Sequence, residues 1–204
     1  MITIIDYGVG NVRAFLNAFK LLNVDARAVR TKDELADTTR VILPGVGAFD
    51  HAMESLEHSG MRETLDELVL RRGVPVLGVC VGMQMLGMSS EEGGRPGLGW
   101  INGRVRGMRA LDASGDMRLP HMGWNDVHPT AGVRLFEGLE NGSRFYFLHS
   151  FYFECVREEN TAAVATYGTE FSCAVHSGNI YGVQFHPEKS HQFGTRLLKN
   201  FAAL

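Results

Sequence analysis

The chain has 204 residues, 45% of them hydrophobic and 21% charged, with a formal net charge of -3 at pH 7. This length and composition are sufficient to bury one sizeable core, so we expect a single domain spanning residues 1–204. The slightly acidic charge argues against a nucleic-acid partner, and no apolar stretch is long enough to cross a membrane. Because the N-terminus enters a strand pattern without a signal peptide, we expect a cytoplasmic protein with reduced thiols.

The first part of the chain alternates predicted strands and helices. Strands are expected over residues 2–5, 26–29, 41–43 and 74–79, with helices over residues 12–22 and 48–72 and from Met83 onward. This alternation is typical of βαβ units and predicts a parallel sheet. The later part of the chain reads instead as successive strands over residues 100–108, 144–153, 162–167, 171–176 and 180–185, closed by a helix over residues 193–201.

A glycine-rich segment, Gly8-Val9-Gly10-Asn11, follows the first predicted strand. It resembles part of a dinucleotide-binding loop, but Arg13 stands where the third glycine is required, and the second strand does not end in the acidic residue that would hold a ribose. A tight turn between strand and helix accounts for both glycines. The sequence therefore predicts no cofactor at this turn.

A second glycine-rich segment, Pro44-Gly45-Val46-Gly47, ends another predicted strand. The carboxyl ends of parallel strands share one edge of a sheet, so we expect this loop to face the turn that follows the strand over residues 74–79. A loop in that position can form an oxyanion hole, with one backbone donor from Val46 or Gly47 and another from Val81. A plain turn is the alternative.

The turn after the strand over residues 74–79 is Gly78-Val79-Cys80-Val81-Gly82, the pattern of a nucleophile elbow. Small residues on both sides permit the strained backbone of such a turn. The helix that follows favours the thiolate form of Cys80. The pattern indicates acyl transfer through a thioester, whereas a lone buried cysteine would be an inert small hydrophobe.

A proton-transfer partner for Cys80 is found far downstream, where His186 and Glu188 follow the last predicted strand. The spacing predicts that His186 acts as the base and that Glu188 orients its ring. The other two cysteines, Cys155 and Cys173, lie within strand patterns and are interpreted as structural. The remaining histidines form no zinc signature, so we expect no metal.

Together these segments resemble the class I (triad) glutamine amidotransferases, and the similarity extends from end to end. The resemblance rests on the elbow, the Pro44 to Gly47 loop and Gln184-Phe185-His186-Pro187-Glu188-Lys189-Ser190. It implies an α/β, flavodoxin-like three-layer fold with a central mainly parallel sheet and additional antiparallel strands. It further implies that glutamine is the substrate, with Cys80 as nucleophile, His186 as base and Glu188 as its partner.

Two further segments, Leu119 to Asn125 and Tyr146 to Phe151, are similar to members that work in histidine biosynthesis. Those members pass ammonia to a (βα)8-barrel cyclase subunit, which implies a heterodimer. By position, the resemblance assigns glutamine binding to Gln84, His149 and Ser150, and contacts with the partner to Asn11, Trp124 and Lys189. Trp124 would alternatively be a core aromatic residue beside Met122.

The chain departs from the family pattern at Val81, where the family usually has leucine. This matters little because the oxyanion donor is a backbone group.

Three alternative functions are weighed on the sequence. Paralogues in surface-polysaccharide gene clusters supply ammonia to a nucleotide-sugar-modifying synthetase and would share these motifs. A stand-alone cysteine hydrolase would use the same dyad. A decayed, purely binding module is disfavoured because all three triad residues are present.

Overall fold

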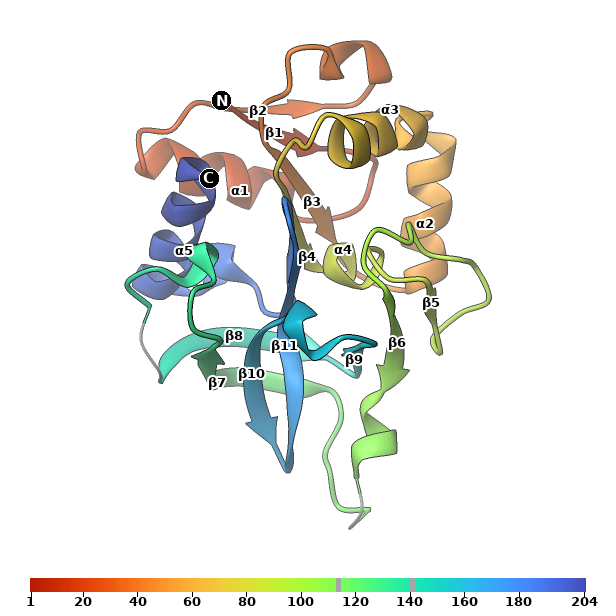
Figure 1. Cartoon of the computed structure of the whole chain (residues 1–204), viewed down its shortest axis with the longest axis vertical. Coiled ribbons are helices and arrows are strands. Elements are labelled where there is room, and N and C mark those ends of the chain that lie inside the picture. Colours follow the sequence, from red (N-terminus) through yellow and green to blue (C-terminus); the bar gives the residue numbers. More distant parts are fainter. Residues whose placement is uncertain (113–114, 140–141) are drawn as a thin grey trace.

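The computed structural model describes residues 1–112, 115–139 and 142–204. Within these residues a 9-stranded sheet runs through the molecule in the order β2-β1-β3-β4-β12-β11-β10-β7-β8 (Figure 1). Its strands are β1 (Ile2–Ile5), β2 (Ala26–Val29), β3 (Val41–Gly45), β4 (Val76–Cys80), β7 (His121–Pro129), β8 (Ser143–His149), β10 (Thr161–Tyr167), β11 (Thr169–Ser177) and β12 (Ile180–Val183). A 3-stranded sheet contains β5 (Ser89–Ser90), β6 (Gly103–Gly107) and β9 (Phe151–Cys155).

The helices lie on both sides of the parallel strands. They are α1 (Val12–Leu21), α2 (Phe49–His58), α3 (Arg62–Asp66), α4 (Val81–Gln84) and α5 (His191–Ala203). In Figure 1, α1 and α5 lie on one side of the central strands, with α2 and α3 on the other. Helices on both faces of a sheet make the predicted three-layer α/β fold, which is confirmed.

The sheet changes direction at β12. The strands from β2 to β12 pair in parallel, whereas those from β12 to β8 pair antiparallel. The predicted antiparallel strands are thus present. Within the described residues, this sheet has four parallel and four antiparallel strand pairings. The parallel strands β3 and β4 are buried along their whole length, as expected for strands covered on both faces.

The observed elements differ from the expected ones mainly in the later part of the chain. The single strand predicted over residues 144–153 is two strands, β8 and β9, which belong to different sheets and separate at Ser150. The helices predicted within residues 48–72 are present as α2 and α3, and they are separated at Gly60, whose φ of 68° a continuing helix does not permit. The strand β7 was not predicted, because its apolar Met122 and Trp124 face outward and its alternation is inverted.

Among the described residues, none of the helices combines the length and apolar character needed to span a membrane. The buried apolar side chains of all layers form one continuous core. This core supports the sheet edge where β3, β4 and β12 end, and that edge carries the predicted chemical groups.

Candidate active site

Cys80 ends β4 and begins the turn into α4, with φ 56° and ψ −114°. A positive φ is uncommon for a residue with a side chain and costs free energy, so the surrounding packing must enforce it. The enforcement is steric. A Cβ added to Gly82 would overlap the carbonyl oxygen of Leu43 in β3, and one added to Gly78 would meet the Gly82 carbonyl. The two glycines flanking Cys80 are therefore required by the close approach of β3, β4 and the turn.

The helix that follows is shorter than predicted. We expected a helix from Met83 onward, whereas α4 covers only Val81–Gln84. One turn contains few aligned peptide dipoles, so its stabilisation of a thiolate is smaller than that of a full helix. Support for the nucleophile must therefore come mainly from other side chains around it.

The Pro44 to Gly47 loop lies beside Cys80, as the shared sheet edge predicted. β3 pairs in parallel with β4, and Gly45 is the register partner of Cys80. Val46, Gly47 and Val81 line the same hollow as the thiol, and Gly47 has a φ of 81°. The buried Tyr7 hydroxyl donates a hydrogen bond to the Pro44 carbonyl (2.6 Å), which holds the start of the loop.

His186 and Glu188 follow β12, which pairs in parallel with β4 and so ends at the same edge. The Nδ1 atom of His186 lies 2.9 Å from Oε1 of Glu188, and their side chains are only 4% and 1% exposed. The turn is held on β8, because the His186 backbone N–H donates to the Tyr146 carbonyl and the Tyr146 backbone N–H donates to the Ser190 hydroxyl. This geometry leaves Nε2 of His186 as the ring atom available to Cys80.

The protonation of His186 is set by competing effects. Burial lowers the pKa of His186, but hydrogen bonds with Cys80 and Glu188 outweigh it and raise that pKa to about 9. His186 is therefore an imidazolium at neutral pH, in contact with the sulfur. A thiolate–imidazolium pair is the reactive form of a cysteine nucleophile.

The pH dependence of activity follows from this pKa. Because the pKa of His186 is raised from 6.5 to about 9, the imidazolium persists below pH 9 and is lost as the pH rises through that value. We expect kcat/KM for glutamine hydrolysis to fall about tenfold per pH unit above about pH 9, since the leaving amine then lacks its acid. The measurement is a pH–rate profile of the full chain. A decline that begins near pH 6.5 would contradict the assignment, and Glu188→Gln should shift the decline to lower pH.

The hollow around Cys80 has a volume of about 290 Å³. It is lined by Val46, Gly47, Cys80, Val81, Gln84, Glu92, Pro120, Leu148, His149, Ser150, Phe151, His186 and Lys189. The structure thus places Cys80 and His186 in the same hollow as the residues predicted for the oxyanion hole and for glutamine binding.

Four further residues of this lining were not predicted from the sequence: Glu92, Pro120, Leu148 and Phe151. Glu92 lies in a glycine-rich loop that the sequence marks only as a connection, and its carboxylate accepts a hydrogen bond from the Phe49 backbone N–H (2.8 Å).

His149 reaches the hollow, but both of its ring nitrogens are engaged. Nδ1 lies 2.8 Å from the Phe151 carbonyl, and Nε2 lies 2.9 Å from Nδ1 of His121. Burial lowers the pKa of His149 to about 3, despite the bond to Phe151. The ring is therefore neutral and occupied, so a contact of His149 with glutamine would come from its backbone.

The three predicted partner-contact residues are exposed. The Trp124 ring stacks on His191 (5.1 Å between centroids), and Nζ of Lys189 lies 5.8 Å from the centre of the Tyr146 ring. Asn11 directly precedes α1. The alternative placement of Trp124 in the core is wrong, because its side chain is 40% exposed.

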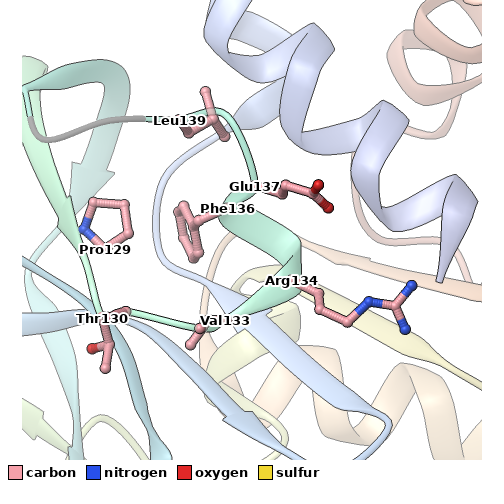
Figure 2. Close-up of a pocket in the computed structure, with 9 residues that line it drawn as sticks. Pro129, Thr130, Val133, Arg134, Phe136, Glu137 and Leu139 are labelled. Atoms are coloured by element: carbon pink, nitrogen blue, oxygen red, sulfur yellow. The ribbon is translucent and has the colours of Figure 1, made fainter.

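Another hollow, of about 560 Å³, is lined by residues of the segment from Pro129 to Leu139. Figure 2 shows the Phe136 ring facing Pro129, while the Arg134 side chain extends away. Its lining residues include neither a thiol nor an imidazole. Within the described residues, no group of three or more His, Cys, Asp or Glu side chains is placed to hold a metal. The smaller hollow at Cys80 is therefore the candidate active site.

The fold and this site define an enzyme class in which a thiolate attacks an acyl group and a histidine supplies the proton. A family model, glutamine amidotransferase class-I, matches residues 3–204. The chain therefore belongs to the class-I glutamine amidotransferase family, as the motifs indicated.

Individual proteins of this family are similar to the chain over its whole length. The chain is 59% identical over 204 residues to a Bdellovibrio bacteriovorus protein named imidazole glycerol phosphate synthase subunit HisH, covering 100% of both chains. It is 50% identical over 204 residues to a protein of the same name from Leptospira interrogans, again covering 100% of both. A crystal structure of a glutamine amidotransferase shares the fold, with a TM-score of 0.75 at 22% identity over 100% of this chain and 99% of the other.

Proposed function

We propose that this chain is the glutaminase subunit of imidazole glycerol phosphate synthase, and that it supplies ammonia to a cyclase subunit in histidine biosynthesis. The observation that carries the proposal is the Cys80, His186 and Glu188 group at one sheet edge, in a chain 59% identical over its full length to such a subunit. The chain acts as one glutamine amidotransferase domain over residues 1–204, in the cytoplasm and without a cofactor.

The reaction proceeds through a cysteinyl thioester. The Cys80 thiolate attacks the side-chain carboxamide carbon of glutamine, and backbone N–H groups of Val46 or Gly47 and of Val81 stabilise the oxyanion. His186 gives its proton to the leaving nitrogen, which departs as ammonia. A water molecule then attacks the thioester while His186 takes its proton, releasing glutamate and the thiolate. Glu188 keeps the His186 ring oriented through both steps.

The charges around the hollow suit an amino-acid substrate. Besides the triad, its lining residues include one carboxylate, Glu92, and one ammonium, Lys189. A free glutamine carries both an ammonium and a carboxylate, so a carboxylate and an ammonium among the lining side chains favour the zwitterion over a peptide bond. Gln84 and Ser150 add uncharged polar groups to the same lining. This arrangement argues against a hydrolase of bulkier acyl groups.

Exposed apolar side chains lie beside the hollow, which Val46 and Leu148 help to line. Met122 is 65% exposed and lies opposite Leu148, which is 39% exposed, in the β7–β8 pair. Val46 and Trp124 are also exposed. Exposed apolar side chains grouped beside an active site are typical of a protein interface, and tryptophan is a frequent anchor of such interfaces. We assign this surface to a (βα)8-barrel cyclase subunit in a heterodimer, with Asn11 and Lys189 at its margin.

We expect the isolated chain to be a poor glutaminase that becomes strongly active when the barrel subunit carries its acceptor ligand. Glycines on both sides of Val46 permit a peptide flip that presents or withdraws one oxyanion donor. Loss of one such donor costs about a hundred- to a thousandfold in rate, which is enough for a switch. The measurement is steady-state glutamine hydrolysis by the chain alone, with the barrel, and with the barrel plus ligand.

The outcomes separate the alternatives. Full activity of the chain alone would contradict the switch and favour a stand-alone hydrolase. Activity that the cyclase and its ligand do not raise would favour the polysaccharide paralogue, whose partner is a different synthetase. The relatives at 50% and 59% identity carry the name of the histidine enzyme, which supports the cyclase. Trp124→Ala is the matched interface variant, and it should weaken the stimulation while leaving the basal rate unchanged.

A further inference from the structure

A polar side chain outside the triad also contacts the Cys80 sulfur. Gln184 follows β12, two residues before His186, and is fully buried. Its Nε2 donates a hydrogen bond to Sγ of Cys80 at 3.7 Å. Its Oε1 accepts a hydrogen bond from Nε2 of Gln84 at 3.0 Å. The two buried amides therefore form a chain of hydrogen bonds that ends on the nucleophile.

The negative charge of the Cys80 thiolate, at the end of this chain of hydrogen bonds, determines the orientation of both amides. If the Gln184 amide were rotated, its carbonyl oxygen would face the thiolate, and its NH2 group would face the NH2 group of Gln84. Both contacts would be repulsive in a buried site where an unmet polar group is costly. The backbone N–H of Gln184 is itself held by the Cys173 carbonyl (2.9 Å), so the side chain starts from a fixed position.

We propose that Gln184 is a catalytic residue that stabilises the Cys80 thiolate by hydrogen bonding, and that Gln84 is a positioning residue that orients the Gln184 amide. This inference rests on Cys80 being the nucleophile of the proposed function. A hydrogen bond to a charged sulfur is stronger than one to a neutral thioester sulfur. The donor therefore favours the thiolate before attack and again as it leaves during hydrolysis of the thioester. Because Gln84 also lines the substrate hollow, it links bound glutamine to the nucleophile.

The other titratable groups near Cys80 do not obscure the effect of the Gln184 hydrogen bond on the thiolate. Tyr7 faces the sulfur from the loop after β1, and burial raises its pKa further above the neutral range. His149 stays neutral because burial lowers its pKa to about 3. His186 from the end of β12 is the ionic partner of the thiolate, and Glu188 orients it. Glu92 and Lys189, across the hollow, are unchanged in every variant compared, so their ionisation cancels.

The test uses Gln184→Met, which keeps the size of the side chain but removes the donor. The rate of Cys80 alkylation by iodoacetamide is followed from pH 5 to 10 by peptide mass spectrometry on the full chain. We expect the variant to react about tenfold more slowly at neutral pH, with its profile displaced to higher pH. At the alkaline plateau it should react about threefold faster, because a more basic thiolate is a better nucleophile. A profile that coincides with the wild type would overturn the proposal.

Two further variants separate this role from structural damage. Gln84→Met should displace the profile in the same direction by less, and the double variant should behave like Gln184→Met alone. Asn179→Leu is the control, since it loses two partly buried hydrogen bonds, to the Val69 and Val74 carbonyls, without touching Cys80. It should unfold at a lower temperature but keep the wild-type profile. A rate rise at every pH in Gln184→Met would indicate loosening and overturn the proposal. Alkylation needs no glutamine, so this result is independent of whether the proposed substrate is right.

Discussion

Replacing Cys80 with alanine or serine should abolish glutamine-dependent synthesis by the assembled enzyme while leaving ammonia-dependent synthesis largely intact. Formation of the thioester requires the thiolate, whereas the acceptor chemistry takes place on the partner subunit. We expect glutamine hydrolysis to fall at least about a thousandfold. The measurement is the rate of product formation with glutamine or with ammonium salt as nitrogen source, using equal amounts of the two subunits.

The structure offers a matched control for this experiment. Cys155 is a half-buried thiol at the end of β9 whose pKa is raised by burial, and it does not line the active-site hollow. Cys155→Ser should therefore retain both activities. Glutaminase activity of Cys80→Ala above about one-thousandth of the wild type would show that the nucleophile is elsewhere.

His186→Ala should lower the rate of thioester formation by orders of magnitude, and Glu188→Ala should lower it less. His186 transfers the proton, whereas Glu188 orients the ring and acts through it at 2.9 Å. The measurement is the pre-steady-state rate of ammonia release with the partner subunit and its ligand present, because ammonia leaves as the thioester forms. His128→Ala on β7 is the control, because that side chain is exposed and absent from the hollow.

Equal and mild losses in both variants would place the base outside the triad. Among the residues that line the hollow, His149 carries the other imidazole, but the structure disfavours it as the base. Its ring is held between Phe151 and His121, and burial keeps it neutral with a pKa of about 3. A neutral ring with no free nitrogen is a poor proton shuttle at pH 7.

Several features of this protein follow from the sequence because they depend on local spacing. The elbow at Cys80 needs small residues two positions before and after it, and the chain shows both glycines. Fully apolar runs such as 41–43 and 74–79 indicate buried parallel strands, and the carboxyl ends of such strands share an edge. From this rule alone, the Pro44 to Gly47 loop is expected beside Cys80, and the register of β3 with β4 confirms it.

Other features could not be predicted from the sequence, because the hydrophobic patterns of the strands concerned are ambiguous. The alternation from Arg144 to Phe153 continues through Ser150, and nothing local reveals that the two halves pair with different sheets. On β7 the apolar Met122 and Trp124 face outward, so they do not mark the buried face of the strand. Periodicity reports which residues share a face, but it cannot say which face is covered.

By itself the sequence determined the family, the layered α/β fold and the candidate triad, because the elbow around Cys80 and the spacing of His186 and Glu188 are both local patterns. Only the tertiary structure decided how those groups are protonated and supported. The raised pKa of His186 depends on Cys80, and the ring of His149 is occupied by His121. The hydrogen bonds from Gln84 to Gln184 and from Gln184 to the Cys80 sulfur likewise connect residues that are distant in sequence. Hydrogen bonding and burial depend on distances of a few ångströms between such residues, and these distances exist only once the sheet has assembled.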